Sequence, residues 1–223
     1  MNRSEWINAR RRETEELYDK LWAPEYGEKW GLYSNASHLK FIEKILSLLP
    51  SHSKILDAAC GAGRYMPYFL EKGHDVVGID QAQGMLAKAQ AKFPAAQTEK
   101  VGLQEMAYRE TFDGAICMDA MEHIAPEDWP LVLGNFQQAL KPRGYLYFTE
   151  EIPGEEEIKE VEEAFKQGQE QGLPIIHGEC IDCMVYHYYP SMEQVREWVR
   201  NAGLTVIEEG EGDGYHHFLT RKG

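Results

Sequence analysis

Short apolar runs alternate with helix-periodic stretches through most of the chain. Five of these runs have the length and composition of buried strands: 54–59, 75–80, 99–103, 114–119 and 145–151. Amphipathic helical spacing marks the stretches between them at 64–72, 84–92 and 127–140. Strands that alternate with helices in this way predict an α/β fold, with a doubly wound, mostly parallel sheet and helices on both faces.

The C-terminal residues predict one change of strand direction. Ser191 and Gln194 form a capping-box pattern, and Gly203 is placed to end the helix that follows. Two strand-like runs, 204–209 and 215–222, come next and are separated only by the acidic glycine turn GEGDG. So short a link permits only antiparallel pairing. We therefore expect a seven-stranded sheet with a reversed C-terminal strand.

Two further segments lie outside this alternation. The N-terminal segment joins a helical stretch at 4–22 to an aromatic-rich connection, and residues 152–190 form an insertion after the fifth strand. The N-terminal aromatic side chains that are candidates for closing a pocket are Tyr18, Trp22, Tyr26, Trp30 and Tyr33. We expect residues 1–223 to form a single domain with an N-terminal helical cap at about 1–36 and a lid at about 152–190.

The charge and the N-terminus limit the partners. The chain has 223 residues, with 23 Lys and Arg against 37 Asp and Glu, and a formal net charge of −14. This excess of negative charge would repel a phosphate backbone, so no nucleic-acid partner is expected. The charged opening lacks the apolar block of a signal peptide, and no apolar run is long enough to cross a bilayer. These features predict a cytoplasmic monomer or homodimer without a membrane partner, whose four cysteines stay reduced.

A glycine-rich turn follows the first predicted strand. Gly61 and Gly63 remove side chains where the backbone must approach a ligand, and the next helix offers unpaired amide donors. Met66 stands where a dinucleotide fingerprint has its third glycine, which argues against a nicotinamide or flavin cofactor. Asp80 ends the second strand, where a carboxylate can accept hydrogen bonds from two ribose hydroxyls or cap the next helix. Together, the loop and the acid indicate an adenosine-type ligand.

Four motifs resemble the class I S-adenosylmethionine-dependent methyltransferases in their order and spacing: LDAACGAGRY, VVGIDQAQGML, FDGAICMDAMEHI and LKPRGYLYF. The resemblance covers residues 37–150 strongly and residues 190–223 in outline. The terminal reversed hairpin also matches the sheet of that family. The resemblance implies S-adenosyl-L-methionine as the cofactor and S-adenosyl-L-homocysteine as the product.

The cofactor-binding residues that the resemblance implies are Asp57, Ala59, Gly61, Gly63, Asp80, Gln81, Met85, Leu103, Gln104 and Met118. Asp80 would hold the ribose, Gln81 and Met85 would flank the adenine, and Met118 would lie beside the cofactor. The first four residues would form the loop around the methionine part.

Two positions depart from the family pattern. Ala59 stands where the family often has a glycine, and alanine still allows a close approach. Gly102 stands where the family often has an aspartate that meets the adenine amino group. Leu103 and Gln104 are the nearest substitutes for that contact.

Three interpretations remain open for Asp119, Glu122 and His123, which share one face if a helical turn begins there. They can position or deprotonate the methyl acceptor, with His123 the best base by its unperturbed pKa. They can bind a divalent cation that orients the acceptor's oxygens, as some quinone-type relatives do. They can also be structural, with the acids capping the turn. We expect Glu122 and His123 to be catalytic, without a metal.

The insertion contains the stretch HGECIDCMVYH, at residues 177–187. His177, Cys180, Cys183 and His187 have metal-ligand side chains, but the thiol pair lies inside the histidine pair and no second CxxC accompanies it. A redox pair would need the thioredoxin-like context that is absent here. Packing or pocket lining is therefore the favoured interpretation, with His187, Tyr188 and Glu179 placed to meet a substrate and His187 a catalytic candidate.

Methyl transfer from a sulfonium requires the acceptor, the methyl group and the sulfur to be held in line, with water excluded. The sequence therefore predicts an S-adenosylmethionine-dependent methyltransferase that acts on a small molecule. A protein or peptide methyltransferase and a non-catalytic S-adenosylmethionine-binding protein are the alternatives. The sequence does not identify the acceptor, because specificity lies in loops and lid segments.

Overall fold

A computed structural model describes residues 1–25, 35–180 and 185–223. Its main sheet has seven strands in the order β3-β2-β1-β4-β5-β9-β8. The strands are β1 Lys54–Ala58, β2 Asp75–Asp80, β3 Gln97–Lys100, β4 Phe112–Cys117, β5 Leu140–Glu151, β8 Leu204–Gly212 and β9 Tyr215–Lys222. Strands β1 to β5 pair in parallel, whereas β9 runs antiparallel to both of its neighbours. The predicted doubly wound sheet with a reversed C-terminal strand is confirmed.

Each face of this sheet is covered by helices. Their bounds are α3 Ala36–Leu48, α4 Met66–Leu70, α5 Gln83–Lys92, α6 Trp129–Ala139 and α8 Met192–Asn201. Alternate residues of one strand enter different hydrophobic clusters: Leu146 and Phe148 pack with α6 and α8, whereas Tyr147 between them packs with α3 and α4. This alternation is the period of two that a strand imposes on its side chains. The sheet therefore separates two hydrophobic cores. The carboxyl ends of its parallel strands are the part of the sheet left to bind ligands.

Of the element boundaries that differ from the predicted ones, three change the local structure most. Strand β3 ends at Lys100, so residues 102 and 103 belong to the following turn and the 3-10 helix η2 Leu103–Glu105. Strand β5 begins at Leu140, because the chain becomes extended directly after α6 ends and continues along the sheet. Strand β8 continues through Gly212, which shortens the predicted five-residue turn to two residues, 213 and 214. Both adopt left-handed backbone angles, as a tight hairpin requires.

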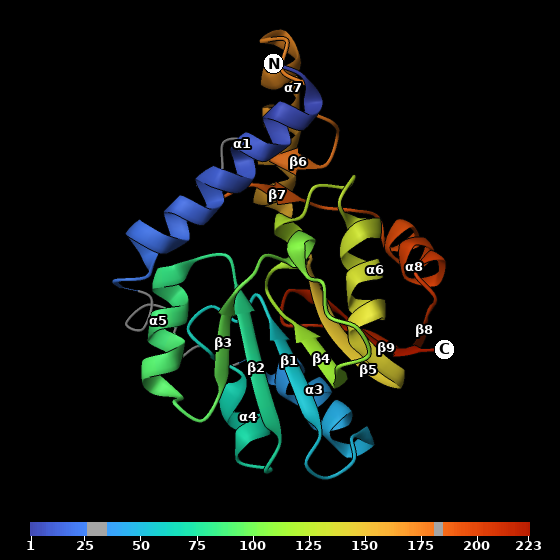
Figure 1. Cartoon of the computed structure of the whole chain (residues 1–223). Coiled ribbons are helices and arrows are strands. Elements are labelled where there is room, and N and C mark those ends of the chain that lie inside the picture. Colours follow the sequence, from blue (N-terminus) through green and yellow to red (C-terminus); the bar gives the residue numbers. More distant parts are fainter. Residues whose placement is uncertain (26–34, 181–184) are drawn as a thin grey trace.

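The N-terminal segment and the insertion lie together above the carboxyl ends of the parallel strands (Figure 1). Helix α1 Arg3–Glu16 continues as the π-helix η1 Leu17–Trp22. The insertion consists of α7 Glu155–Glu170 and a small antiparallel pair, β6 Glu179–Cys180 and β7 His187–Tyr188. The Trp6 and Tyr186 rings join the two segments, with centroids 5.9 Å apart. The division into one domain with a cap and a lid remains a prediction, and Tyr26, Trp30, Tyr33 and Cys183 lie outside the described residues.

Among the described residues, no helix combines the length and apolar character that a bilayer crossing requires.

Candidate functional site

A cavity opens at the carboxyl ends of β1, β2 and β4, and α1 and η1 form its roof. It holds about 960 Å³ of space, part of which is open to solvent. Nine of the ten predicted cofactor residues line it: Asp57, Ala59, Gly61, Asp80, Gln81, Met85, Leu103, Gln104 and Met118. They come from separate segments, which meet here because parallel strands expose their carboxyl ends at one edge of the sheet. The predicted set is thus brought together, with one exception.

That exception is Gly63, which lies under the loop rather than in the cavity wall. A side chain at Gly63 would collide with the Met66 sulfur and the Phe93 ring, both 2.9 Å from the added carbon. Its φ of +79° is also a conformation that L side chains rarely adopt. Gly61 is the glycine that borders the cavity, with a φ of +51°. Gly63 is not among the residues that line the cavity, so its contact with the ligand stays a prediction, and its lack of a side chain lets the loop pack against Met66 and Phe93.

Asp80 connects the glycine loop to the second strand. Its carboxylate accepts the Gly61 N–H at 2.9 Å and the Ala82 N–H at 2.8 Å. Burial raises the pKa of this carboxyl, and the amide donors oppose the shift. Each carboxylate oxygen can still accept a second hydrogen bond. The two interpretations of this residue are therefore compatible, since Asp80 supports the start of α5 and also faces the cavity.

Asp57 lies at the base of the same cavity and is 3% exposed. Its Oδ2 atom has no hydrogen-bond partner among the described residues. Burial, followed by the nearby Asp80 carboxylate, raises the pKa of Asp57 to about 8. A buried carboxyl of this kind becomes ionised readily only when a cation approaches it. The pair of acids thus prepares the cavity for a positively charged ligand.

The turn after β3 forms the side wall. The Asn135 side-chain amide donates to the Leu103 and Gln104 carbonyls at 2.9 and 3.1 Å, which ties the turn to α6. The Gln104 amide donates to Asp128 at 3.2 Å, so it is turned toward α6. Val101 and Gly102 also line the cavity. At the position where the family often has an aspartate, this wall presents a glycine.

Asp119, Glu122 and His123 do not share one helical face, so that expectation is wrong. Asp119 has a left-handed backbone, with a φ of +53°, and only residues 121–123 form a 3-10 turn, η3. Asp119 and His123 line the cavity, whereas Glu122 is buried outside its lining. Burial raises the pKa of Glu122 well above its usual value, and the Asp119 carboxylate adds to this shift. Within the described ranges, no group of three or more acidic, histidine or cysteine side chains is arranged to hold a metal ion.

His123 is held from both sides of its ring. Nδ1 lies 3.0 Å from the Tyr186 carbonyl oxygen, so this nitrogen carries the hydrogen and Nε2 accepts from the Tyr18 hydroxyl, 3.3 Å away. Burial and the neighbouring His187 lower the pKa of His123 to about 3. The imidazole is therefore neutral at neutral pH, and the lone pair of its Nε2 atom points toward the Tyr18 hydroxyl of η1.

His187 does not line the cavity, although it contacts His123, with ring centroids 4.7 Å apart. Its Nδ1 donates to the Val185 carbonyl oxygen at 2.9 Å, and burial lowers the pKa of the ring. Tyr188 and Glu179 are buried in the insertion. None of the three lines the cavity, so contact between these groups and a substrate stays a prediction.

Within the described part of the cysteine stretch, Cys180, Val185 and Tyr186 are buried, whereas His177 is exposed. Cys180 is buried and disulfide-bonded, so the expectation that all four cysteines stay reduced is not met, and its partner lies outside the described residues. Cys60 and Cys117 are free and buried. His177 packs on the Phe165 ring, with centroids 5.6 Å apart.

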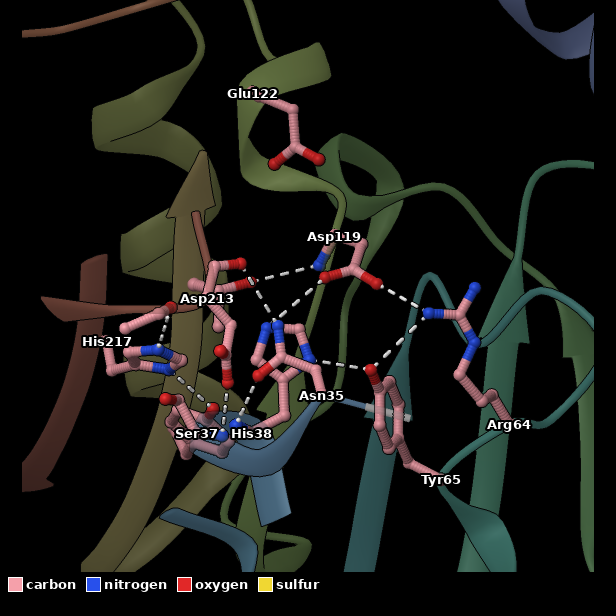
Figure 2. Close-up of polar contacts among 12 residues, drawn as sticks. Asn35, Ser37, His38, Arg64, Tyr65, Asp119, Glu122, Asp213 and His217 are labelled. Carbon is pink, nitrogen blue, oxygen red and sulfur yellow. Dashed lines mark hydrogen bonds and ion pairs between the residues drawn. The ribbon is translucent and has the colours of Figure 1, made fainter. Parts of the chain in front are cut away.

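Several cavity residues were missing from the sequence-based set. Arg64 and Tyr65 follow the glycine loop directly, and that adjacency was a usable signal. Arg11 and Thr14 reach the cavity from α1, where no motif marks them. Figure 2 shows Arg64 and Tyr65 joined to Asp119 and to His38 of α3. His38 carried no sequence signal, because a histidine on an amphipathic helix has no distinguishing neighbours.

Comparisons with known proteins agree with this geometry. Residues 55–144 match the family described as methyltransferase domain. A putative methyltransferase of Bacillus subtilis is 34% identical over 125 residues, which cover 52% of this chain and 50% of that protein. The malonyl-[acyl-carrier protein] O-methyltransferase of Pectobacterium atrosepticum is 23% identical over 90% of this chain and 85% of its own length. The chain thus spans about half the length of the first of these relatives.

The fold itself matches solved methyltransferase structures. The 1,6-didemethyltoxoflavin-N1-methyltransferase of Burkholderia thailandensis, solved with its substrate and S-adenosylhomocysteine, aligns with a TM-score of 0.62 at 17% identity, over 99% of this chain and 86% of its own. The sheet order and the acidic cavity at its carboxyl edge define a Rossmann-like nucleotide-binding protein of the methyltransferase type. Residues 55–144 therefore match the methyltransferase domain family, and the chain has the fold of solved S-adenosylmethionine-dependent methyltransferases.

Proposed function

We propose that the protein transfers a methyl group from S-adenosyl-L-methionine to a small-molecule acceptor in this cavity. The main support for this proposal is that nine residues with cofactor-binding chemistry line one cavity. One of them is the buried Asp57, whose Oδ2 atom has no hydrogen-bond partner among the described residues. The bound cofactor supplies an electrophilic methyl group on a sulfonium. Its ammonium and sulfonium charges suit the two acids, so the residues present fit this group.

The chain's own residues hold and enclose the ligands. Asp80 accepts hydrogen bonds from the ribose hydroxyls, Asp57 from the ammonium group, and Gln81 and Met85 border the adenine. His123 and Tyr18 lie across the cavity and bind the acceptor. The roof of α1 and η1 places Thr14 and Tyr18 over the opening, which favours a small acceptor and excludes water from the transfer.

Relatives support the same class of acceptor. The proteins named above methylate an acyl-carrier-linked malonyl group and a toxoflavin precursor. The reaction type carries over to this chain more readily than either substrate, since the residues around the acceptor differ among such enzymes.

Asp80→Asn tests the cofactor site. Losing the charge at the ribose contact is expected to weaken binding of S-adenosylhomocysteine by about 10- to 100-fold, because a charge-assisted hydrogen bond contributes roughly 1.5–3 kcal/mol. Titration calorimetry measures this, with Asp75→Asn at the exposed opposite end of β2 as the matched control. A wild-type protein that binds neither S-adenosylmethionine nor its product would contradict the proposed function.

Asp57 predicts proton release on binding. Since burial and the nearby Asp80 raise its pKa to about 8, the carboxyl is mostly protonated at pH 7 and must ionise when a cationic group arrives. We expect close to one proton to leave for each cofactor bound. Calorimetry at pH 7 in buffers of different ionisation enthalpy measures the release, and Asp57→Asn should abolish it. Equal heats in all buffers would show that Asp57 does not face the cation.

A further inference from the structure

A glycine in the cavity wall makes room for a carboxylate. Gly102 lines the cavity just after β3, and its backbone has a φ of −79° and a ψ of 163°. Any residue can adopt these angles, so the backbone does not require glycine here. A side chain at this position would instead collide with the Oε2 atom of Glu105 in η2. The Glu105 carboxylate therefore occupies the space that a larger residue at position 102 would fill.

Glu105 is held in this position from two directions. Its backbone N–H donates to the Gly102 carbonyl at 3.1 Å, which closes the turn of η2. Its Oε1 atom accepts from the Arg11 guanidinium of α1 at 2.6 Å, and Arg11 lines the cavity from the roof. The Glu105 side chain is 57% exposed, so its carboxylate lies at the rim, between two residues that line the cavity. Arg11 binds one carboxylate oxygen, which leaves Oε2 to accept from a ligand.

The strand order places the base of a bound cofactor beside this carboxylate. Asp57, Asp80 and Lys100 lie at the carboxyl ends of β1, β2 and β3, which are neighbours in the sheet (Figure 1). In the proposed function, Asp57 faces the ammonium group and Asp80 faces the ribose. The base and the sulfur are attached to different ends of the ribose, so the base lies beyond Asp80, at the turn that follows β3. The Val101 N–H donates to the Asp80 carbonyl at 3.1 Å, which keeps this turn next to the ribose position.

We infer that Glu105 is a specificity-determining residue, whose carboxylate accepts a hydrogen bond from the exocyclic amino group of the cofactor's adenine. This inference rests on the proposed function. A carboxylate offers only acceptors, and adenine presents a hydrogen-bond donor at its 6-position. A purine with an oxygen at the 6-position would place two acceptors against each other. The site therefore selects adenine over a 6-oxopurine.

Gln104 is the other polar side chain of this turn, and its chemistry fits less well. Its amide nitrogen donates to Asp128 at 3.2 Å, which turns the side chain toward α6. Its Oε1 atom would lie 4.0 Å from a carbon added at Gly102, further away than the Glu105 oxygen. A neutral amide forms weaker hydrogen bonds than a carboxylate. It also offers both a donor and an acceptor, so it would not distinguish the two kinds of purine.

Base selectivity tests the inference. The measured quantity is the ratio of the affinities for S-adenosylhomocysteine and S-inosylhomocysteine, in which an oxygen replaces the amino group of the base. We expect Glu105→Gln to lower this ratio by about tenfold, because a hydrogen bond to a charged group changes affinity by roughly 10- to 100-fold and the new amide can bind either base. Titration calorimetry measures both affinities. A fall of less than threefold would overturn the inference.

Two control variants separate a contact with the base from a general effect on the roof. Glu15 also joins α1 to the end of β3, through Lys100 at 2.8 Å, so Glu15→Gln removes a similar ion pair and should leave the ratio unchanged. If Glu15→Gln lowered the ratio as much as Glu105→Gln, Glu105 would act only through the roof and the inference would be wrong. Gln104→Ala should change both affinities by the same factor. A loss of selectivity in Gln104→Ala alone would assign the contact to Gln104 instead.

Moving the carboxylate tests its position. Gly102→Asp combined with Glu105→Ala returns one carboxylate to the same part of the wall, where the backbone accepts the new residue without strain. We expect the double variant to recover the selectivity that Glu105→Ala loses. A double variant no more selective than Glu105→Ala would show that the base does not lie beside residue 102. Binding of S-adenosylhomocysteine by the wild-type protein keeps the proposed function intact in each of these outcomes, and its absence would contradict that function instead.

Discussion

Arg3→Ala is expected to lower the free energy of unfolding by about 3 kcal/mol, because it leaves the buried Glu179 carboxylate without its charged partner. The Arg3 guanidinium donates to both Glu179 oxygens, to both Glu127 oxygens and to the Pro174 carbonyl. Glu179 is 0% exposed and also accepts from the Tyr186 hydroxyl at 2.6 Å. One side chain of α1 thus connects the N-terminal segment to the insertion.

The same change should loosen the roof of the cavity. Thr14 and Tyr18 line the cavity from the helical segment that Arg3 anchors. Once α1 is released, we expect weaker binding of S-adenosylhomocysteine and faster amide hydrogen exchange in α1 and in β6. Denaturant titration, calorimetry and hydrogen-exchange mass spectrometry measure the three effects.

Two further variants give this prediction its controls. Arg12→Ala removes an exposed arginine of the same helix and should change the free energy of unfolding by less than about 0.5 kcal/mol. Adding Glu179→Gln to Arg3→Ala removes the unpaired buried charge and should recover part of the lost stability. If Arg3→Ala were no more disruptive than Arg12→Ala, the ion pair would not be what joins the two segments.

Glu150→Gln is expected to stabilise the protein at and above neutral pH. Glu150 is 0% exposed, and neither of its carboxyl oxygens has a partner among the described residues. Burial raises its pKa well above the usual value, and the buried Glu122 adds to the shift. A carboxyl whose pKa is raised in the folded state stabilises the protein below the unfolded pKa of about 4.5, and this stability is lost as pH rises through the folded pKa.

The wild-type free energy of unfolding should therefore fall between pH 5.5 and pH 8.5. Glu150→Gln removes the ionisation, so its curve should be flatter and lie about 2 kcal/mol above wild type at pH 8.5. Denaturant titrations at the two pH values measure this, with Glu43→Gln on the exposed face of α3 as the control. Adding Glu122→Gln should give less than the sum of the single effects, since each acid shifts the pKa of the other. A Glu150→Gln variant less stable than wild type at pH 8.5 would contradict this account.

The sequence predicted the architecture well because parallel α/β folds have strong local signals. Val76 and Val77, like Leu146 and Tyr147, are apolar neighbours that point to opposite faces of their strands, which marks strands covered by helices on both sides. Gly203 and the Asp213–Gly214 turn carry the chemistry of a helix end and a tight hairpin. Boundaries were less certain, as at Leu140, where sheet pairing extended a strand that local preference would have started later.

For the candidate site, the accuracy of the prediction also depended on which element supplies each residue. The residues that follow a strand end, from Asp57 to Met118, met in one cavity because the strand order alone brings those ends together. The residues that come from helices and from the insertion could not be assigned in this way. Glu122, His187 and Gly63 are not among the residues that line the cavity.

The sequence by itself thus determined the sheet, its reversed strand, the glycine loop and the acids at the strand ends. These features depend on periodicity and on neighbouring residues, which a linear pattern records. Only the tertiary structure brought His38 of α3 to Tyr65 and Asp119, and Arg3 to Glu179, 176 positions further along the chain. Contacts between elements so far apart depend on how helices pack over the sheet, and no local pattern carries that information.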